Sequence, residues 1–322
     1  MTGTMQDKAK KRGDELIIEA NACLNAYVLF GFGKADKHRE AADKFKMAGN
    51  SFKIAQAWEQ CGDAFLKANE NFKLTGDDAL DALTCLEEAG QAYKKDKGDN
   101  DRAISVLQQA VDTYNLGGRF ARGSKALESI AEIHESDENW EAAIETYDQI
   151  AQLALNDNKP SQANKWHLKM AGILSEKMEA YARAGEIFKN VGDQSMESNL
   201  GKYAAKGYYF QYLCCLIATG DCVGVEAGLE SCKNTDYSFA SSRESEFIQR
   251  LNQAGMDCNN QEYAQACADF DAISPLDPWK TTLLLKGRNH IPDDESTTIV
   301  SNHALNEVVV GEEGEDDDYD LM

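Results

Sequence analysis

The chain has 322 residues, of which 33 are Lys or Arg and 55 are Asp or Glu, giving a formal net charge of −22. This charge opposes long-range attraction to nucleic acid or to an anionic membrane, although local basic patches can exist. The charged first 20 residues do not resemble a signal peptide, and no run of about 18 apolar residues could span a bilayer. We therefore expect a cytoplasmic protein without a nucleic-acid partner.

Segments that combine small residues and aromatics at helical spacing recur along the chain. They begin near Ala41, Ala82, Ala103, Ala143, Ala163 and Ala184. From Ala82 the successive intervals are 21, 40, 20 and 21 residues, and a further helix from Ser124 falls within the interval of 40. Turn-forming residues such as Gly117-Gly118 separate the segments, and no proline occurs before Pro160. Each segment therefore reads as one helix plus a turn, and two make a unit of about 40 residues.

Large side chains recur opposite small ones in these segments. The candidates for the core are Phe45, Phe65, Tyr93, Tyr114, Tyr147 and Phe188. Small Ala and Gly positions let neighbouring helices approach closely, while the aromatic rings fill the spaces between them. This pattern is typical of a tetratricopeptide-like solenoid, in which each helical hairpin buries its apolar stripe against its neighbours.

The predicted fold is all-α and has three parts. Residues 1–221 are expected to form the solenoid, a twisted sheet of antiparallel helices, and residues 222–289 a smaller C-terminal helical bundle. The remaining residues, 290–322, are expected to form an acidic disordered tail. From residue 292 onward the chain holds 11 acidic residues and no Lys or Arg, which is half of the net charge.

The sequence offers no catalytic constellation. The nine cysteines are odd in number and include no Cys-x-x-Cys pair, so we interpret them as buried or incidental free thiols. The DDDYD run at residues 316–320 matches a metal-binding Asp-Asp-x-x-Asp pattern, but it lies in the acidic tail rather than on a helix inside an apolar cavity. Neither a P-loop nor a Gly-x-Ser-x-Gly motif occurs. We expect no metal, no cofactor and no enzymatic activity.

An apolar run occupies residues 27–33, between the first two predicted helices. It contains Leu29, Phe30 and Phe32, with glycines beside both phenylalanines. Part of this run could end the first helix and pack inward. Alternatively it forms an exposed loop, and such apolar patches usually mark contact with a partner or a membrane.

Positive charge recurs at the repeat length. Lys125, Lys165 and Lys206 are 40 and 41 residues apart, so equivalent positions in successive hairpins would place them along one surface. Arg119 and Lys169 fall in nearby registers. One interpretation is solvated lysines aligned by chance, and the other is a binding surface for a long, acidic, rod-like partner.

Six stretches spread along the chain have a distinctive order and spacing up to about Gly287. They are FKMAGNSFKIAQAWEQCGDAF, GRFARGSK, SQANKWHLKMAG, LGKYAAKGYYF, SSRESEFI and LDPWKTTLLL. In their order and spacing they resemble the soluble NSF attachment proteins, the SNAP family of membrane-fusion adaptors, and most closely its alpha type.

The resemblance implies an adaptor in which several copies bind a SNARE four-helix bundle through a basic face. The residues at matching positions are Arg119, Lys125, Lys165, Lys169, Lys206 and Arg243, with Lys94 and Lys95 as weaker candidates. It further implies that Leu29, Phe30 and Phe32 touch the membrane surface, which makes the protein a peripheral membrane protein. The acidic C-terminal end, with Asp318, Asp320 and Leu321, together with Asp257, would recruit and stimulate the hexameric NSF ATPase.

The sequence departs from the family pattern in three places. About 25 additional residues precede the terminal GEDDDYDLM, Gln253 and Met256 replace expected acids near Asp257, and Gln56 replaces an expected basic residue. Two other readings remain open at this point. One is a generic tetratricopeptide-like scaffold for another peptide or protein, and the other is a gamma-type member of the same family.

Overall fold

The computed structural model describes residues 2–26, 34–76, 79–96, 98–199 and 201–292. Within these ranges the chain forms 15 α-helices and no β-strand, arranged as successive helical hairpins, so the predicted all-α fold is confirmed. None of the helices in the described ranges combines the length and apolarity that a membrane crossing requires. The apolar run at 27–33 and residues 293–322 of the predicted tail lie outside the described residues.

The chain packs into two compact units, Met1–Met170 and Ala171–Met322, which divide within α8. The division predicted at residues 221 and 222 falls between α10 and α11 and stays a prediction. The helices of the first unit are α1 (Thr2–Asn25), α2 (Lys34–Ala55), α3 (Trp58–Lys73), α4 (Ala79–Lys95), α5 (Asn100–Leu116), α6 (Phe120–Ser136), α7 (Trp140–Asn156) and most of α8 (Pro160–Glu176). The second unit holds the end of α8, α9 (Tyr181–Ser195), α10 (Lys202–Thr219), α11 (Cys222–Thr235), α12 (Tyr237–Ala240), α13 (Arg243–Met256), α14 (Asn260–Asp271) and α15 (Pro278–Arg288).

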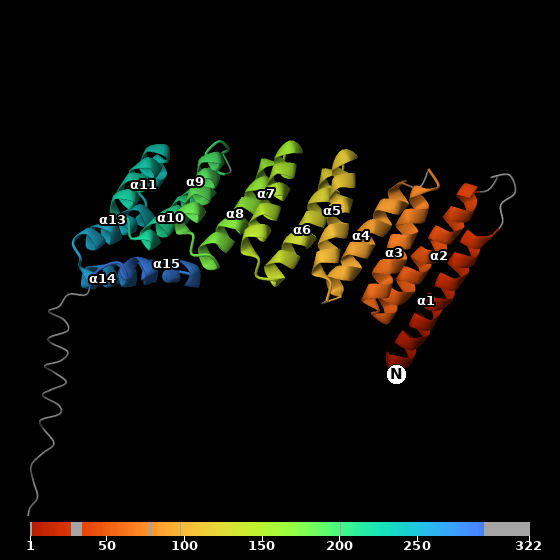
Figure 1. Cartoon of the computed structure of the whole chain (residues 1–322). Helices are drawn as coiled ribbons and strands as arrows, with labels where there is room; N and C mark the ends of the chain where they lie inside the picture. Colours follow the sequence, from red (N-terminus) through yellow and green to blue (C-terminus); the bar gives the residue numbers. More distant parts are fainter. Residues whose placement is uncertain (1, 27–33, 77–78, 97, 200, 293–322) are drawn as a thin grey trace, which may run out of the picture. The chain divides into compact units, whose positions relative to one another are not determined.

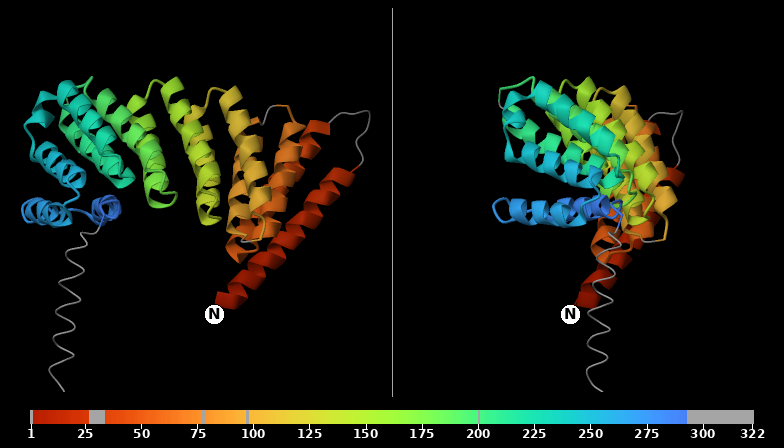
Figure 2. Two further views of the ribbon diagram at one scale, coloured as in Figure 1. Left: turned by 60° about the vertical axis from the view of Figure 1, so that its left-hand side comes forward. Right: turned by 90° about the vertical axis from the view of Figure 1, so that its left-hand side faces the viewer.

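In the first unit consecutive helices run antiparallel, and each packs against the next along the chain from α1 to α7. Figure 1 and the left-hand view of Figure 2 show these helices side by side in chain order. Each hairpin therefore buries its apolar stripe against the hairpins on either side, as the repeat in the sequence predicts.

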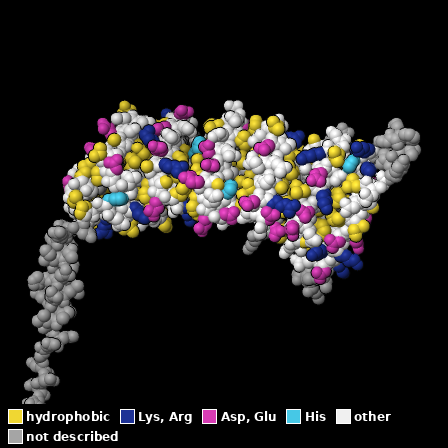
Figure 3. Space-filling model, viewed as in Figure 1, with side chains coloured by type: hydrophobic (Ala, Val, Ile, Leu, Met, Phe, Trp, Pro, Cys, Tyr) yellow, Lys and Arg dark blue, Asp and Glu magenta, His cyan; other side chains and the backbone are white. Residues whose placement is uncertain are grey.

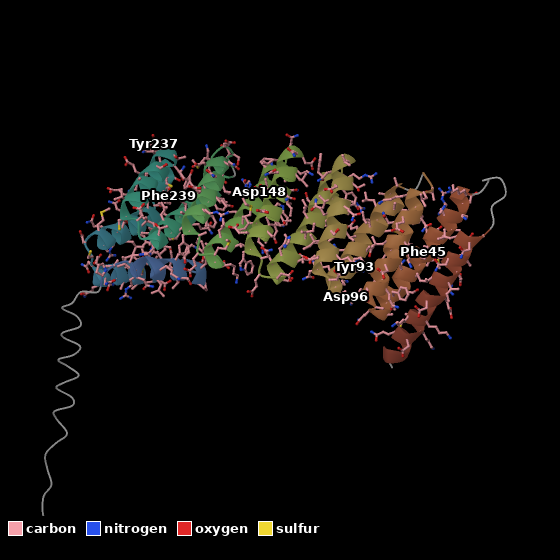
Figure 4. The ribbon with its side chains drawn as sticks, in the orientation of Figure 1. Phe45, Tyr93, Asp96, Asp148, Tyr237 and Phe239 are labelled. Carbon is pink, nitrogen blue, oxygen red and sulfur yellow. The ribbon has the colours of Figure 1, made fainter. Side chains whose placement is uncertain are left out.

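The core of the first unit pairs small residues with rings. Phe45 and Tyr93, both labelled in Figure 4, are 1% and 0% exposed. A Cβ built on Gly62 would lie 2.5 Å from the Tyr93 ring, and one on Gly49 would lie 2.9 Å from the Phe65 ring. Since real Cβ atoms do not approach so closely, only glycine allows these helices to meet. All six predicted core aromatics are buried.

The helix-to-helix turns use a residue in the left-handed region. Gly118 has φ 65°, and Glu138 has φ 56° at the equivalent place in the next turn. The following N–H groups, of Arg119 and Asn139, each donate to a carbonyl five residues earlier at 2.8 Å. This Schellman-type bond satisfies a free helix carbonyl and reverses the chain in few residues. The predicted turn at Gly117-Gly118 is therefore confirmed.

In the second unit α10 is the central helix and packs against α9, α11, α13 and α15. Its Phe210 meets Phe247 of α13 and Phe270 of α14, with ring centroids 6.2 and 5.6 Å away. Phe247 and Phe270 stack on each other at 4.3 Å. An aromatic cluster thus joins α10, α13 and α14.

Candidate protein-binding surface

A groove in the first unit is lined by α2, α3, α4 and α6. It contains charges of both signs rather than a purely basic patch. The charged lining residues are Lys53, Lys94, Lys95, Lys125, Glu87, Glu88, Glu128 and Glu132. Figure 3 likewise shows basic and acidic side chains interspersed over the face of the first unit that it displays.

Ion pairs connect successive even-numbered helices of the first unit. Lys53 of α2 lies 2.6 Å from Glu88 of α4, and Lys94 of α4 is ion-paired with Glu132 of α6. We call the side of α2, α4, α6 and α8 that bears these pairs the even-helix face. Its charges are arranged across helices, because the partners are 35 and 38 residues apart in the chain.

α8 continues this arrangement at the end of the first unit. Lys169 lies 2.9 Å from Glu135 of α6, and the same carboxylate accepts a hydrogen bond from the Tyr147 hydroxyl at 3.0 Å. Burial of Tyr147 and its bond to Glu135 raise the pKa of the tyrosine, so the hydroxyl remains a donor. Glu135 is therefore held in place from two sides.

Other predicted cations of the first unit have no carboxylate partner among the described residues. They are Lys95, Arg119, Lys125 and Lys165, all exposed. The Lys95 ammonium lies 4.8 Å from the Trp58 ring centroid, and that of Lys165 lies 4.6 Å from the Trp166 ring. An exposed cation over an aromatic face keeps its charge available to a partner. The predicted set therefore divides into neutralised and uncompensated residues.

The second unit contains the two remaining predicted cations. Lys206 of α10 lies 2.7 Å from Glu244 of α13, while Arg243 donates to Ser274 at 2.9 Å and lies over the Phe270 ring. Partial burial opposes ionisation of Glu244, but the ion pair with Lys206 favours the carboxylate and the pKa of Glu244 lies below its ordinary value. Because Lys206 belongs to the second unit, its alignment with the lysines of α6 and α8 stays a prediction.

Asp257 follows α13 directly, at its C-terminal end, and is exposed. Its carboxylate accepts from the Gln253 amide at 3.0 Å, and both residues line a groove formed with Glu246 and Glu262. Arg250 of the same groove bonds Glu262 at 2.5 Å and Asp269 at 2.7 Å. This groove leaves Glu246 and Asp257 as carboxylates without a cationic partner among the residues described.

The remaining predicted site residues lie outside the described part of the chain. They are Leu29, Phe30, Phe32, Asp318, Asp320 and Leu321.

The residues that sequence reasoning missed are the acidic partners of the lysines. Nothing in the sequence around Glu132 and Glu135 indicated that they pair with lysines. The one available hint was that their helix, α6, lies in the repeat between α4 and α8, which carry Lys94 and Lys169.

No group of three or more His, Cys, Asp or Glu side chains that could hold a metal ion occurs within the described ranges. All nine cysteines are free, and Cys61, Cys85, Cys214, Cys215 and Cys232 are buried. Burial raises the pKa of Cys61 to about 11 and that of Cys85 to about 12, which keeps both thiols protonated. Stacked hairpins with a grooved, charged face are the features of a protein-binding scaffold.

The family model described as "Soluble NSF attachment protein, SNAP" matches residues 11–292. The chain is 36% identical over 295 residues to the alpha-soluble NSF attachment protein of Mus musculus, covering 90% of this chain and 98% of that protein. It is 30% identical over 285 residues to the Vitis vinifera protein of the same name, covering 88% and 96%. It is also 30% identical over 269 residues to a probable vesicular-fusion protein sec17 homolog of Neurospora crassa, covering 83% and 91%.

The chain belongs to the soluble NSF attachment protein (SNAP) family, which confirms the resemblance predicted from the sequence. Proteins of this family are adaptors and not enzymes. Family membership excludes a tetratricopeptide-like scaffold that is unrelated to the SNAP family.

Proposed function

We propose that this protein is a membrane-fusion adaptor that binds assembled SNARE four-helix bundles and recruits the NSF ATPase to disassemble them. The names of its relatives, NSF attachment protein and vesicular-fusion protein, support this assignment. The observation that carries the SNARE-binding half is the set of uncompensated cations in the first unit. Within the described residues, Lys95, Arg119, Lys125 and Lys165 present positive charge without an internal carboxylate partner in a chain of net charge −22.

A single exposed ion pair contributes only about 0–1 kcal/mol, so binding of this kind requires many contacts at once. Cations on α4, α6 and α8 meet that requirement if the partner is long, rigid and acidic. Several copies around one bundle would multiply the number of contacts further. Alternating charge on the face would also fix the register of the partner, because a shifted partner places like charges together.

The proposed contact with the ATPase uses acidic groups in the second half of the chain. Asp257 and Glu246, which both line the groove of α13 and α14, present carboxylates to solvent. The terminal residues Asp318, Asp320 and Leu321 are the other proposed contacts. Since Gln253 and Met256 replace acids expected from the family, we assign this protein a weaker acidic face on α13 than the family pattern implies.

The proposed membrane contact is made by Leu29, Phe30 and Phe32. Insertion of these apolar side chains into a bilayer surface would contribute about 2–5 kcal/mol, which suits weak and reversible attachment. The proposed location is therefore the cytoplasmic surface of membranes. The test measures how fast NSF and this protein disassemble SNARE bundles. Phe30→Ser with Phe32→Ser should slow disassembly more on liposomes than in detergent, whereas an equal loss of rate in both would contradict a membrane role.

The deciding experiment measures ATP hydrolysis by NSF and the loss of assembled SNARE bundle, with and without this protein. The expected result is stimulated hydrolysis and disassembly. Lys125→Glu with Lys165→Glu should weaken binding to the bundle by tenfold or more. Each substitution replaces an attractive cation by a carboxylate that repels the acidic groups of the bundle around it.

The matched control is Lys10→Glu with Lys73→Glu, which changes the net charge equally on α1 and α3. This control should bind as the unchanged protein does, with the same helicity by circular dichroism. Equal weakening in both variants would indicate a net-charge effect, and unchanged binding of the first variant in moderate salt would refute the basic face.

A further inference from the structure

Helix α6 supplies carboxylates to the lysines on both of its neighbours in the even-helix face. Glu132 is ion-paired with Lys94 of α4, and Glu135, three residues later, is paired with Lys169 of α8 at 2.9 Å. On the same helix Lys125 has no such partner among the described residues. One face thus carries both available and internally neutralised cations.

We propose that Glu132 and Glu135 act as intramolecular counter-charges that limit the affinity of the even-helix face for an acidic helical partner and thereby set its specificity. The inference rests on the proposed function, because the partner is the acidic bundle. It adds two acidic residues to a surface otherwise defined by its cations.

The geometry explains how the counter-charges would act. A partner carboxylate that approaches Lys94 must share the ammonium with Glu132, whose side chain is 53% exposed and meets the incoming partner directly. Glu135 is only 25% exposed and is held by both Lys169 and the Tyr147 hydroxyl, so its charge cannot move away. Both carboxylates repel an acidic partner over the short range that salt leaves unscreened.

Such counter-charges also provide selectivity. An unbroken row of lysines attracts any polyanion, including nucleic acid and anionic lipid. Fixed carboxylates between the lysines penalise polymers of uniform negative charge, whereas a folded helical bundle can place its own charges to avoid them. The effect of these residues should therefore appear as a gain of binding when they are neutralised.

The test is Glu132→Gln, alone and combined with Glu135→Gln, measured as Kd for the assembled SNARE bundle at low and at moderate salt. Each neutralised carboxylate should tighten binding about 1.4- to 5-fold, and the pair about 2- to 25-fold, as exposed ion pairs of this kind allow. The gain should shrink as salt rises. Unchanged or weaker binding of both variants would overturn the proposal.

A double-mutant cycle identifies the route of the effect. If Glu132 acts by neutralising Lys94, then Glu132→Gln should tighten binding less in a Lys94→Gln background than in the unchanged protein. A purely structural role would not produce this dependence. The matched control, Glu70→Gln with Glu145→Gln on the odd-numbered helices α3 and α7, changes the net charge equally and should leave Kd unchanged.

The reference variant Lys125→Glu with Lys165→Glu separates the two hypotheses. If that variant loses binding while the glutamine variants gain none, only the counter-charge proposal fails. If the unchanged protein does not bind the bundle, the proposed function fails and this inference fails with it. Melting curves of each variant show whether folding is preserved, and Glu132→Gln alone remains informative if the weaker bond from Tyr147 to a neutral amide destabilises the double variant.

Discussion

Three helices of the first unit and the last five helices of the second begin in different ways. The N-cap residues of α3, α6 and α7 (Ala57, Arg119 and Asn139) make no side-chain capping bond, whereas α5 of the same unit is capped by Asp99, which accepts from the Arg102 N–H. By contrast, every helix from α11 to α15 has an N-cap side chain that accepts from a backbone N–H. Those N-cap residues are Asp221, Asp236, Ser242, Asn259 and Asp277.

The difference shows where the position of each helix is decided. In the hairpin stack a short left-handed turn and tight packing against both neighbours determine where the next helix starts. In the terminal bundle the helix ends also contribute through side-chain caps, even between α13 and α14, where Cys258 forms the same kind of left-handed turn with φ 53°. Close packing should therefore dominate stability in the first unit and capping should matter more in the second.

The largest expected effect is at a glycine contact of the first unit. Gly62→Ala would place a methyl group 2.5 Å from the Tyr93 ring, which is fully buried and bonded through its hydroxyl to Asp63 at 2.7 Å. The ring cannot move without losing that bond, so we expect the free energy of unfolding to fall by about 1–3 kcal/mol. Urea unfolding followed by circular dichroism measures this change.

The control for this substitution is Gly207→Ala in α10. A Cβ there would meet no atom within 4 Å, so the variant should gain about 0.5–1 kcal/mol from helix propensity. Destabilisation by both substitutions would contradict the steric explanation.

A smaller effect is expected at the caps. Ser242→Ala removes the acceptor of the Ser245 N–H, and we expect a loss of about 0.5–2 kcal/mol in the free energy of unfolding. Asn139→Ala in the first unit removes no capping bond and should change stability by only a few tenths of a kcal/mol. Equal losses at the two positions would remove the distinction between the two regions.

The smallest effect is a pH dependence in the second unit. The pKa of Glu244 lies below its ordinary value of 4.5, because the ion pair with Lys206 at 2.7 Å outweighs partial burial, which alone would raise it. A lowered carboxyl pKa stabilises the fold above the unfolded-state pKa, and this contribution is lost as pH falls through the folded-state value. On acidification from about pH 5 to 3, the unchanged protein should therefore lose more stability than Glu244→Gln does, as measured by melting temperature. An equal loss in both would show that the carboxylate is not stabilised.

Much of the fold was predictable because its signals are local. Periodic small residues and aromatics placed the helices, and Gly117-Gly118 marked a turn that the structure forms with Gly118 at φ 65°. The turns at Gln56 and Glu179 carry no such signal, because neither residue is a glycine. Their backbones adopt φ 58° and 52° because the flanking helices enforce that geometry. The predicted cations Lys125 and Lys165 are exposed, as a binding surface requires.

The sequence by itself determined the helical class, the repeat of about 40 residues, the aromatic core and the family of this protein, because each follows from spacing within one or two helices. Only the tertiary structure decided which cations are neutralised. Lys94 meets Glu132 across 38 residues of chain, and Lys169 meets Glu135 across two helices, while Lys125 meets no carboxylate in the described part of the protein. The physical reason is that an ion pair depends on how neighbouring helices are rotated and spaced, and that is set by the packing of glycines against rings between them.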